Sequence, residues 1–202
     1  MSLLDLPNGY YDLPKGKLAN VVTCLEMTSK PSVGVIALPD GFSLRRFSGA
    51  DLATFRTLFK AIGEDLMWFS RAIMPDEKLG AILDNPQIES YGLFQNEKSI
   101  GLLELNFTEM PNCELAFFGL TKDAIGHGLG RTLMNIGIAK AWEKPINRFW
   151  VHTCHFDHPN ALGFYQRSGF KPYALMVEVH DDPRLSGHLP YHASPHVALI
   201  TS

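Results

Sequence analysis

Cysteine is scarce in this sequence. The 202 residues contain only Cys24, Cys113 and Cys154, and no two of them have C-x-x-C spacing. A disulfide framework or a zinc site of four thiolates would therefore need cysteines from another chain. Cysteines that remain thiols are typical of a reducing compartment, so we expect a cytoplasmic protein.

Long apolar runs and a strong excess of either charge are also missing. The longest apolar stretches, such as Val33–Leu38, fall far short of the ~18 residues that indicate a membrane helix. The 18 basic and 21 acidic residues give a formal net charge of −3, which does not favour a nucleic-acid binder. Residues Met1–Pro7 lack the basic and apolar regions of a secretion signal. We therefore expect a protein that binds neither nucleic acid nor membrane.

The length and the apolar content of 46% fit one globular domain with appendages. Residues 1–32 are predicted to be an N-terminal extension, in which residues 18–27 alternate like a strand at the edge of a sheet. Residues 33–181 are expected to form the domain. Residues 182–202 contain three prolines and are predicted to be an extended tail on the surface.

Apolar periodicity and turn residues predict a mixed order of elements. Strands are expected at 36–47 (broken around Pro39-Asp40-Gly41), 91–95, 99–107, 114–120, 148–154 and 173–180; helices are expected after Ser48, at 64–72, 76–83 and 159–167, and from the glycines near 128 to about 142. Three antiparallel strands followed by β-α-β-α-β indicate an α+β fold, with a central mixed, mostly antiparallel sheet flanked by helices.

A glycine-rich loop at residues 126–130 lies between a predicted strand and a predicted helix. The first N–H groups of a helix have no partner inside it and lie at the positive end of its dipole, so this arrangement suits a phosphate. The dinucleotide motif G-x-G-x-x-G fails at Arg131 and at Leu133, and no Gly-Lys-Ser/Thr triplet is present. Close packing of the helix on the sheet is the other explanation for the glycines.

In this setting the loop resembles the pyrophosphate loop of the GCN5-related N-acetyltransferase (GNAT) superfamily, Gln/Arg-x-x-Gly-x-Gly/Ala. Gly128 and Gly130 match the two small positions, whereas Ile125 replaces the usual Gln or Arg. The resemblance covers about residues 36–180. Further features in the same order as in the superfamily are Glu114, Asn160, Phe164-Tyr165 and Ser168-Gly169-Phe170, and the stretches Phe117–Leu120 and His152–Pro159 resemble a bacterial subset of uncharacterised acetyltransferases.

The resemblance implies a GNAT-like fold and acetyl-CoA as co-substrate, with no metal. The residues that it implies for cofactor binding are Leu120, Thr121, Gly126, His127, Gly128, Leu129, Gly130, Arg131, Asn160 and Tyr165. Asn160 is equally suited to capping the helix that it precedes.

Transfer of an acetyl group to an amine requires a base for the ammonium proton and an acid for the departing thiolate. Tyr165 is the candidate acid, because a phenol is protonated at neutral pH; an ordinary place in the helix core is the other explanation. Glu114 is the candidate base, since histone-type members of the superfamily resemble this chain in placing a glutamate there. Glu104 is the rival base, because it faces away from Leu103 and Leu105. The sequence does not choose between the two glutamates.

Other clusters have simpler explanations. Trp68 and Arg71 follow the first helix, where related folds build the acceptor pocket, and would suit an acceptor with a carboxylate; core packing and a solvated arginine are the default. His152 and Cys154 share a strand face while His155 points away, so a metal site is not expected.

The interpretation that accounts for most of these features is an acetyl-CoA-dependent N-acetyltransferase acting on a primary amine of a small molecule, by direct attack in a ternary complex. Two other functions stay open: a non-catalytic acyl-CoA-binding regulatory module, and an enzyme that acetylates a protein or peptide amine. A homodimer formed through the terminal extensions or a sheet edge is a further hypothesis.

Overall fold

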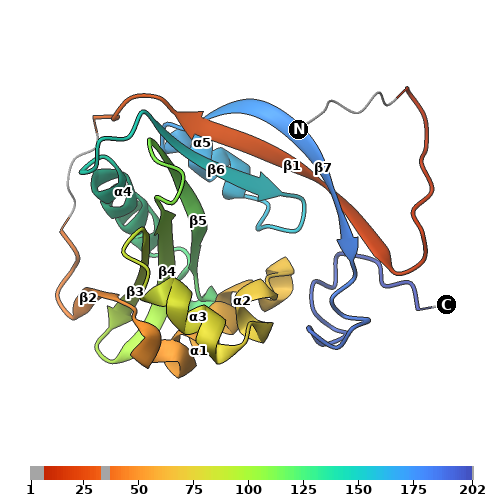
Figure 1. Ribbon diagram of the computed structural model, residues 1–202, viewed down its shortest axis with the longest axis horizontal. Coiled ribbons are helices and arrows are strands. Elements are labelled where there is room, and N and C mark those ends of the chain that lie inside the picture. The colour runs from red at the N-terminus through yellow and green to blue at the C-terminus, as the bar shows by residue number, and fades with distance from the viewer. Residues whose placement is uncertain (1–6, 33–36, 202) are drawn as a thin grey trace.

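The computed structural model describes residues 7–32 and 37–201. In these ranges the chain forms one sheet of seven strands in the order β2-β3-β4-β5-β6-β1-β7 (Figure 1). The strands are β1 (Lys17–Met27), β2 (Phe42–Arg46), β3 (Ile88–Gln95), β4 (Lys98–Asn106), β5 (Asn112–Leu120), β6 (Arg148–Cys154) and β7 (Lys171–Asp181). All neighbours pair antiparallel except β5 and β6, which are parallel.

Helices cover both faces of the sheet. They are α1 (Leu52–Gly63), α2 (Ser70–Ile73), α3 (Asp76–Leu83), α4 (Leu129–Ala141) and α5 (Ala161–Arg167), with short 3-10 turns η1 (Gly49–Asp51), η2 (Glu64–Leu66) and η3 (Lys122–Ala124). One core joins α1 and α3 to the sheet, with Phe59 and Leu102 among its members. The other core joins α4 and α5 to the opposite face, with Leu133 and Leu103 among its members. Among the described residues, no helix combines the length and apolar character that crossing a membrane requires.

β4 shows how one strand serves both cores. Leu103 and Leu105 are fully buried in the core under α4, while Leu102 is fully buried in the core under α1. This division follows from the alternation of side chains along a strand. The predicted fold class, a mixed and mostly antiparallel sheet flanked by helices, is confirmed.

The start of the first helical region also follows the sequence. Ser48 and Asp51 form a capping box, in which the Asp51 carboxylate accepts from the Ser48 backbone N–H at 2.9 Å. The strand before it covers only Phe42–Arg46 of the predicted region 36–47, and residue 36 of that region lies outside the described residues.

β1 is not at the edge of the sheet, and this prediction is wrong. The strand pairs with β6 on one side and with β7 on the other, so its backbone is satisfied by two neighbours. Leu25, in its centre, is fully buried in the core under α4. A strand from the N-terminal segment therefore completes the sheet. The division of the chain at residues 32 and 181 stays a prediction.

The C-terminal segment is also not extended, contrary to the prediction. It folds into consecutive turns around Arg184 and Asp182, whose side chains are almost fully buried. Leu189 and Ala193 pack with Met67 and Phe156 in a small third core. This segment therefore connects the region between α1 and α2 to the loop that follows β6.

Candidate active site

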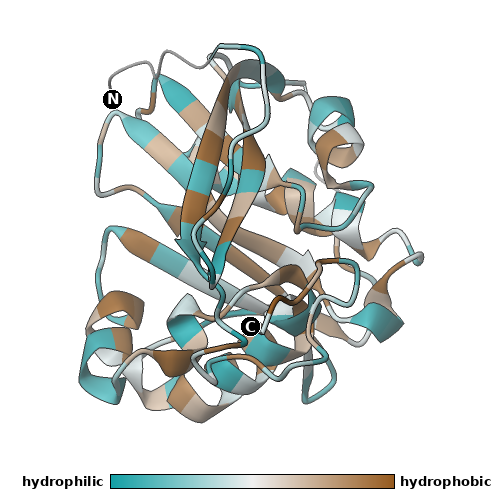
Figure 2. Cartoon of the chain, turned by 90° about the vertical axis from the view of Figure 1, so that its right-hand side faces the viewer, coloured by the Kyte–Doolittle hydropathy of each residue, from teal (hydrophilic) through white to brown (hydrophobic). Residues whose placement is uncertain are grey.

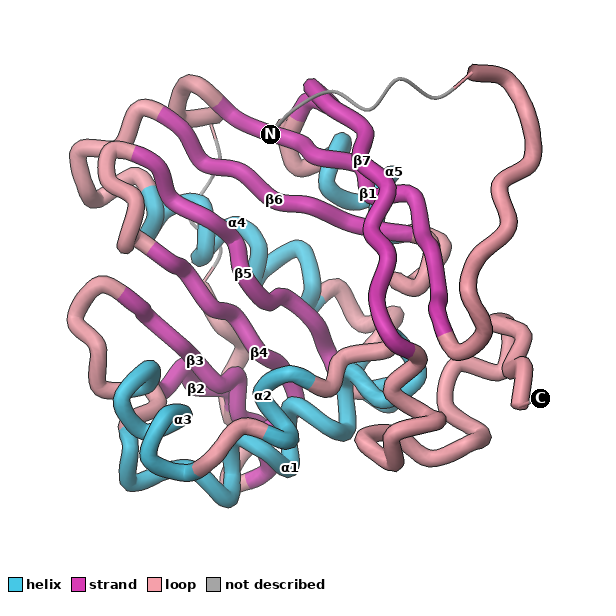
Figure 3. Tube along the Cα trace, turned by 45° about the vertical axis from the view of Figure 1, so that its right-hand side comes forward, coloured by secondary structure: helices cyan, strands magenta, loops and turns pink. Residues whose placement is uncertain are grey.

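The sheet opens between its two parallel strands. Asn112–Glu114 of β5 pair with Arg148–Trp150 of β6, and the pairing ends there although both strands continue beyond these residues. The two strands then diverge (Figure 3). β5 also carries an irregularity at Ala116, because Leu115 pairs with Leu105 and Phe117 with Glu104. Such a bulge bends a strand and interrupts its pairing. The opening therefore begins directly after Glu114.

The glycine-rich loop lies beyond the end of β5, at the start of α4. Gly126 and Gly128 have φ of +93° and +78°, a conformation that residues with a Cβ resist. A Cβ at either position would meet no atom of residues 7–32 or 37–201 within 4 Å, so packing against these residues does not explain the glycines. In the described part of the chain, the backbone N–H groups of residues 126–130 donate no hydrogen bond. The loop therefore presents free donors to open space at a helix N-terminus.

Several other predicted cofactor residues lie beside this loop or on it. A cavity of about 410 Å³ is lined by Thr121, His127 and Leu129, together with residues of β2, β3 and β4. Arg131 is exposed on the first turn of α4, and Ile125 is 48% exposed at the position that departs from the superfamily pattern. Gly130 is closer to the protein, since its Cβ would meet Leu120 at 3.7 Å.

Glu114 lies at the start of the opening. Its Oε2 accepts from the Asn106 side-chain amide at 3.3 Å, and its Oε1 is 4.0 Å from His152 Nδ1 on β6. The Glu114 side chain is 22% exposed, and that of His152 is 49% exposed. Burial raises the pKa of Glu114 above its ordinary value, and the nearby charge of Glu104 adds to the rise. A carboxylate with a raised pKa is better suited to accepting a proton.

Glu104 is fully buried and both of its oxygens are occupied. Arg71 donates to one oxygen at 2.7 Å, and the Ser90 hydroxyl donates to the other at 2.6 Å. The Arg71 guanidinium lies 5.5 Å from the centre of the Phe117 ring, which also meets Trp68 edge to face. Trp68 and Arg71 are therefore brought together with Glu104, with Arg71 already engaged by a carboxylate of the protein.

Tyr165 lies in the aromatic cluster on the α4 side of the opening. Its ring meets Phe118, Phe164 and Phe170 edge to face, at 5.8–6.5 Å between ring centres. Burial raises the pKa of its phenol above the ordinary value, so the hydroxyl remains protonated at neutral pH. Asn160 precedes α5, and its side chain makes no capping hydrogen bond. Helix capping therefore does not account for Asn160.

Three neighbours of the glutamates are not among the predicted site residues. Ser90 donates a hydrogen bond to Glu104, Asn106 donates one to Glu114, and His152, which the sequence suggests only as a metal ligand, lies 4.0 Å from Glu114. In the described part of the chain, no three His, Cys, Asp or Glu side chains gather as metal ligands do. Burial raises the pKa of the Cys154 thiol to about 11, so it is a poor nucleophile.

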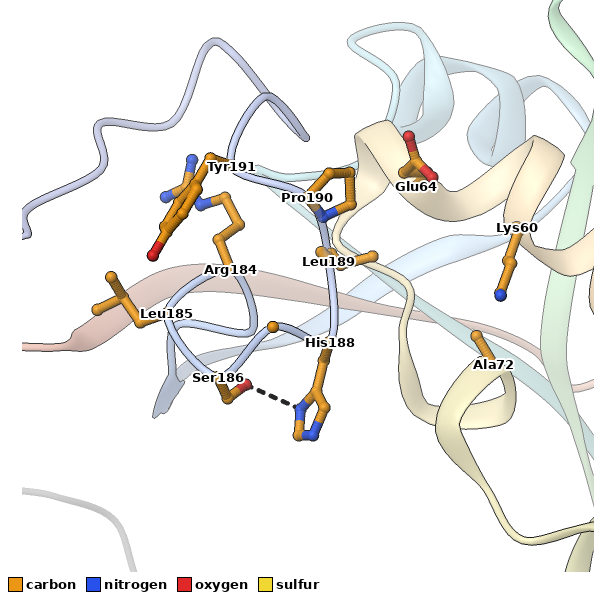
Figure 4. Close-up of a pocket in the computed structure, with 11 residues that line it drawn as sticks. Lys60, Glu64, Ala72, Arg184, Leu185, Ser186, His188, Leu189, Pro190 and Tyr191 are labelled. Carbon is orange, nitrogen blue, oxygen red and sulfur yellow. Dashed lines mark hydrogen bonds between the residues drawn. The ribbon is translucent and has the colours of Figure 1, made fainter.

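A groove of about 670 Å³ separates α1 and α2 from the C-terminal segment. Figure 4 shows Lys60 and Glu64 on one side of the groove and His188 and Tyr191 on the other. The His188 ring stacks on Phe69, which precedes α2. No sequence pattern marks this groove, because one wall is the segment predicted to be an extended tail.

The profile of the acetyltransferase (GNAT) family matches residues 55–170, more than half of the chain. No match was found among curated proteins. Solved structures with the same fold include a GCN5-related N-acetyltransferase from Sphaerobacter thermophilus (13% identity, TM-score 0.57) and one from Kribbella flavida (16%, 0.57). An acetyltransferase from Thermus thermophilus is 19% identical, with a TM-score of 0.54.

The extent of these matches differs. The first two alignments cover 81% and 85% of this chain but only 52% and 63% of the other chains, so this chain spans about half to two thirds of their length. The third covers 70% of this chain and 97% of the Thermus protein. The family profile and the shared fold agree with the opened sheet and the glycine loop on α4. The chain therefore belongs to the acetyltransferase (GNAT) family.

Proposed function

We propose that this chain transfers the acetyl group of acetyl-CoA to a primary amine of a small molecule, by direct attack in a ternary complex. The observation that carries the proposal is the opening between β5 and β6, which has a glycine loop with free N–H donors at one end and Glu114 at the other. We also propose that it acts in the cytoplasm, where Cys24, Cys113 and Cys154 stay free thiols.

The residues around the loop fit a pyrophosphate. Within the described ranges the N–H groups of residues 126–130 have no acceptor, and no atom would contact a Cβ added at Gly126 or Gly128. His127 and Arg131 are exposed nearby and supply donors that replace the side chain lost at Ile125. Acetyl-CoA, when bound, supplies the activated acyl group as a thioester. The residues of the chain hold it and move the protons.

Two side chains are assigned to proton transfer. Glu114 accepts the proton that the ammonium of the acceptor must lose before its nitrogen attacks. His152, half exposed and 4.0 Å away, leads from Glu114 towards water. Tyr165 donates its phenol proton to the departing sulfur. We assign the base to Glu114 rather than Glu104, because Glu104 is already bonded to Arg71 and Ser90.

We place the acceptor on the side of the sheet that carries α1 and α2. Trp68, Phe117 and the guanidinium of Arg71 form one wall there. The groove beside the C-terminal segment is lined by Ala72 of α2 and offers Lys60, Glu64 and His188 as polar partners. The charge of Arg71 is neutralised by Glu104. The negative charge of Glu114 therefore remains uncompensated on this side, and it favours an acceptor with an ammonium group.

Calorimetric titration with acetyl-CoA, compared with free CoA and NAD, tests the cofactor site before any acceptor is known. We expect saturable binding of acetyl-CoA in the micromolar range, about −8 kcal/mol, and none of NAD. Release of free CoA is then followed with panels of small amines and of lysine peptides. Binding without turnover on any amine would support a regulatory module, and turnover on peptides alone would support a peptide acetyltransferase. Absence of acetyl-CoA binding in a folded sample would overturn the proposal.

Replacing Gly128 by alanine tests the role of the loop. A residue with a Cβ pays about 1–2 kcal/mol for the left-handed conformation at Gly128, so the free loop of Gly128→Ala should relax away from it. Restoring the conformation on binding then makes acetyl-CoA binding roughly 5- to 30-fold weaker. Gly130→Ala is the matched control, because its Cβ would make only ordinary contacts at 3.7 and 3.9 Å. Equal Kd values for the two variants by calorimetry would refute this role of Gly128.

Replacing Tyr165 by phenylalanine tests the acid. The ring and its aromatic contacts are retained, so the Kd for acetyl-CoA should stay within about twofold. A thiolate is a fairly good leaving group, so kcat should fall by about 10²-fold, the low end for general acid catalysis. Tyr91→Phe is the control, because the Tyr91 hydroxyl bonds Glu89, away from the opening. Unchanged turnover in steady-state assays would remove Tyr165 from this role.

A further inference from the structure

The two edges of the sheet differ in length and in charge. β2, at one edge, has five residues and two of them are arginines. β7, at the other edge, has eleven residues, and within the described residues it pairs only with β1. Between Lys171 and Glu178 the β7 sequence is Pro-Tyr-Ala-Leu-Met-Val, without a charge. Edge strands of monomeric proteins are usually short, charged or covered, because a free edge pairs with other strands. β2 follows this pattern and β7 does not.

β7 also exposes a row of apolar side chains on one face. Leu175, Val177 and Val179 are 72%, 51% and 52% exposed. Their antiparallel partners on β1 are Thr23, Val21 and Ala19, which adds no charge to this face. Figure 2 shows the resulting hydrophobic bands on the two strands that project from the body of the molecule. Contiguous apolar surface beside an unpaired strand edge indicates an interaction surface.

We propose that β7 pairs antiparallel with β7 of a second copy of this chain, about a two-fold axis at Met176. Met176 is the midpoint of the strand, so this register uses its whole length. It places Lys171 of each copy opposite Asp181 of the other, and Leu175 opposite Val177. The sheets of the two copies become continuous, and the same patch serves both partners, as a two-fold interface requires.

Charge selects this register over its neighbours. With the axis at Val177, Lys171 lies opposite Pro183, beyond the strand. With the axis at Leu175, Lys171 lies opposite Val179 and Asp181 has no partner on the strand. With the axis at Met176, both ends form ion pairs and the apolar residues lie beside one another, which stabilises antiparallel pairs.

The Asp181 side chain is available for this contact. It is 81% exposed, and its present partner is Lys17 of the same chain at 2.7 Å. In the dimer the carboxylate lies between Lys17 and Lys171 of the second copy. Glu178 lies opposite Ala174, so no like charges are opposed along the paired strands.

Sedimentation equilibrium of the full chain tests the proposal. We expect a dimer whose Kd rises by about tenfold or more in Val177→Lys, because a lysine interrupts the apolar row and faces Leu175 of the second copy. Ile73→Lys is the matched control, since Ile73 is 43% exposed on α2 and lies outside the proposed interface. A wild-type monomer, or a dimer that Val177→Lys leaves unchanged, would overturn the proposal.

A charge exchange tests the register. Lys171→Glu and Asp181→Lys each place like charges across the axis and should weaken self-association. Mixing the two variants should restore dimers, because each strand then meets its complement in the other. Failure of the mixture to form dimers more readily than either variant alone would contradict the register.

Cross-linking locates the axis. In Met176→Cys the two introduced thiols would lie directly opposite each other, with the Cα atoms of the two copies about 4.5–5.5 Å apart, within disulfide range. Under mild oxidation this variant should form a covalent dimer, while Glu178→Cys and the wild type should not. A cross-link at position 178 in place of 176 would refute the proposed axis.

Discussion

Replacing Glu114 by glutamine is expected to lower kcat by about 10²- to 10⁴-fold, the usual contribution of a general base. Glutamine keeps the size of the side chain and can still bond Asn106, so the fold and the binding of acetyl-CoA should change little. The amide cannot take a proton from the ammonium of the acceptor. Single-turnover measurement of CoA release at saturating acetyl-CoA isolates this step from binding.

The pH profile makes the test sharper. Glu114 acts as a base only when it is ionised, so kcat/KM should fall as the pH falls through its pKa. Because burial raises that pKa, the acidic limb should lie above the ordinary range for a glutamate and should be absent in Glu114→Gln. The pKa of this carboxyl is lowered by His152 and Asn106 and raised by the charges of Glu104 and Glu109.

Glu109→Gln is the matched control for this prediction. Glu109 is exposed in the loop between β4 and β5, and its charge reaches Glu114 only weakly, as the last of the influences on its pKa. Its replacement should leave kcat within about twofold. If Glu114→Gln retains wild-type turnover at every pH, the base lies elsewhere and Glu104 becomes the residue to replace.

The parts of the fold that sequence predicted correctly are those with local signals. The helix start after Ser48, the hairpin of β3 and β4, and the strand-glycine-helix sequence around Gly128 depend on residues close to one another along the chain. Gly126 and Gly128 both have positive φ, a conformation that glycine adopts more readily than residues with a Cβ.

The parts that sequence did not predict depend on distant partners. The sequence of β1 suggests an edge strand, because the alternation of its side chains is the same whether the strand has one neighbour or two. Its pairing with β6 and β7 joins residues more than a hundred positions apart. From the sequence, Arg71 is expected to be a solvated arginine, but in the structure its guanidinium lies 2.7 Å from Glu104 of β4. Neither pairing leaves a local pattern, so composition and periodicity could not reveal them.

The C-terminal segment is the clearest case of this limit, and replacing Arg184 by alanine tests its role. The Arg184 side chain is 1% exposed and that of Asp182 is 3% exposed, with Arg184 Nη2 2.7 Å from the carboxylate. The guanidinium also donates to the backbone carbonyls of Ala193, Val197 and Ala198. One side chain therefore joins both ends of the segment.

Arg184→Ala should lower the free energy of unfolding by about 3–5 kcal/mol, because it leaves a buried carboxylate without a partner. For a chain of this size the loss corresponds to a fall in Tm of roughly 6–20 °C. Urea and thermal denaturation measure it. The matched control is Arg45→Ala, which removes a bidentate ion pair with Glu97. The two side chains of this pair are 44% and 86% exposed, so its loss should lower the free energy of unfolding much less.

The response to acid distinguishes the buried charge from lost packing. Arg184 holds the pKa of Asp182 below its ordinary value, so in the wild type the pair stabilises the fold above the unfolded pKa of about 3.9 and loses this contribution as the pH falls. In Arg184→Ala the unpaired carboxyl favours its neutral form, so the difference from the wild type should shrink towards acid pH. The double variant Asp182→Asn with Arg184→Met should recover much of the stability at neutral pH, because no charge remains buried. The other outcome is a loss of unfolding free energy that is the same at every pH and the same in Arg184→Ala and in the double variant. It would mean that Arg184 stabilises the fold through its volume and its bonds to the three carbonyls, and that the ion pair contributes nothing.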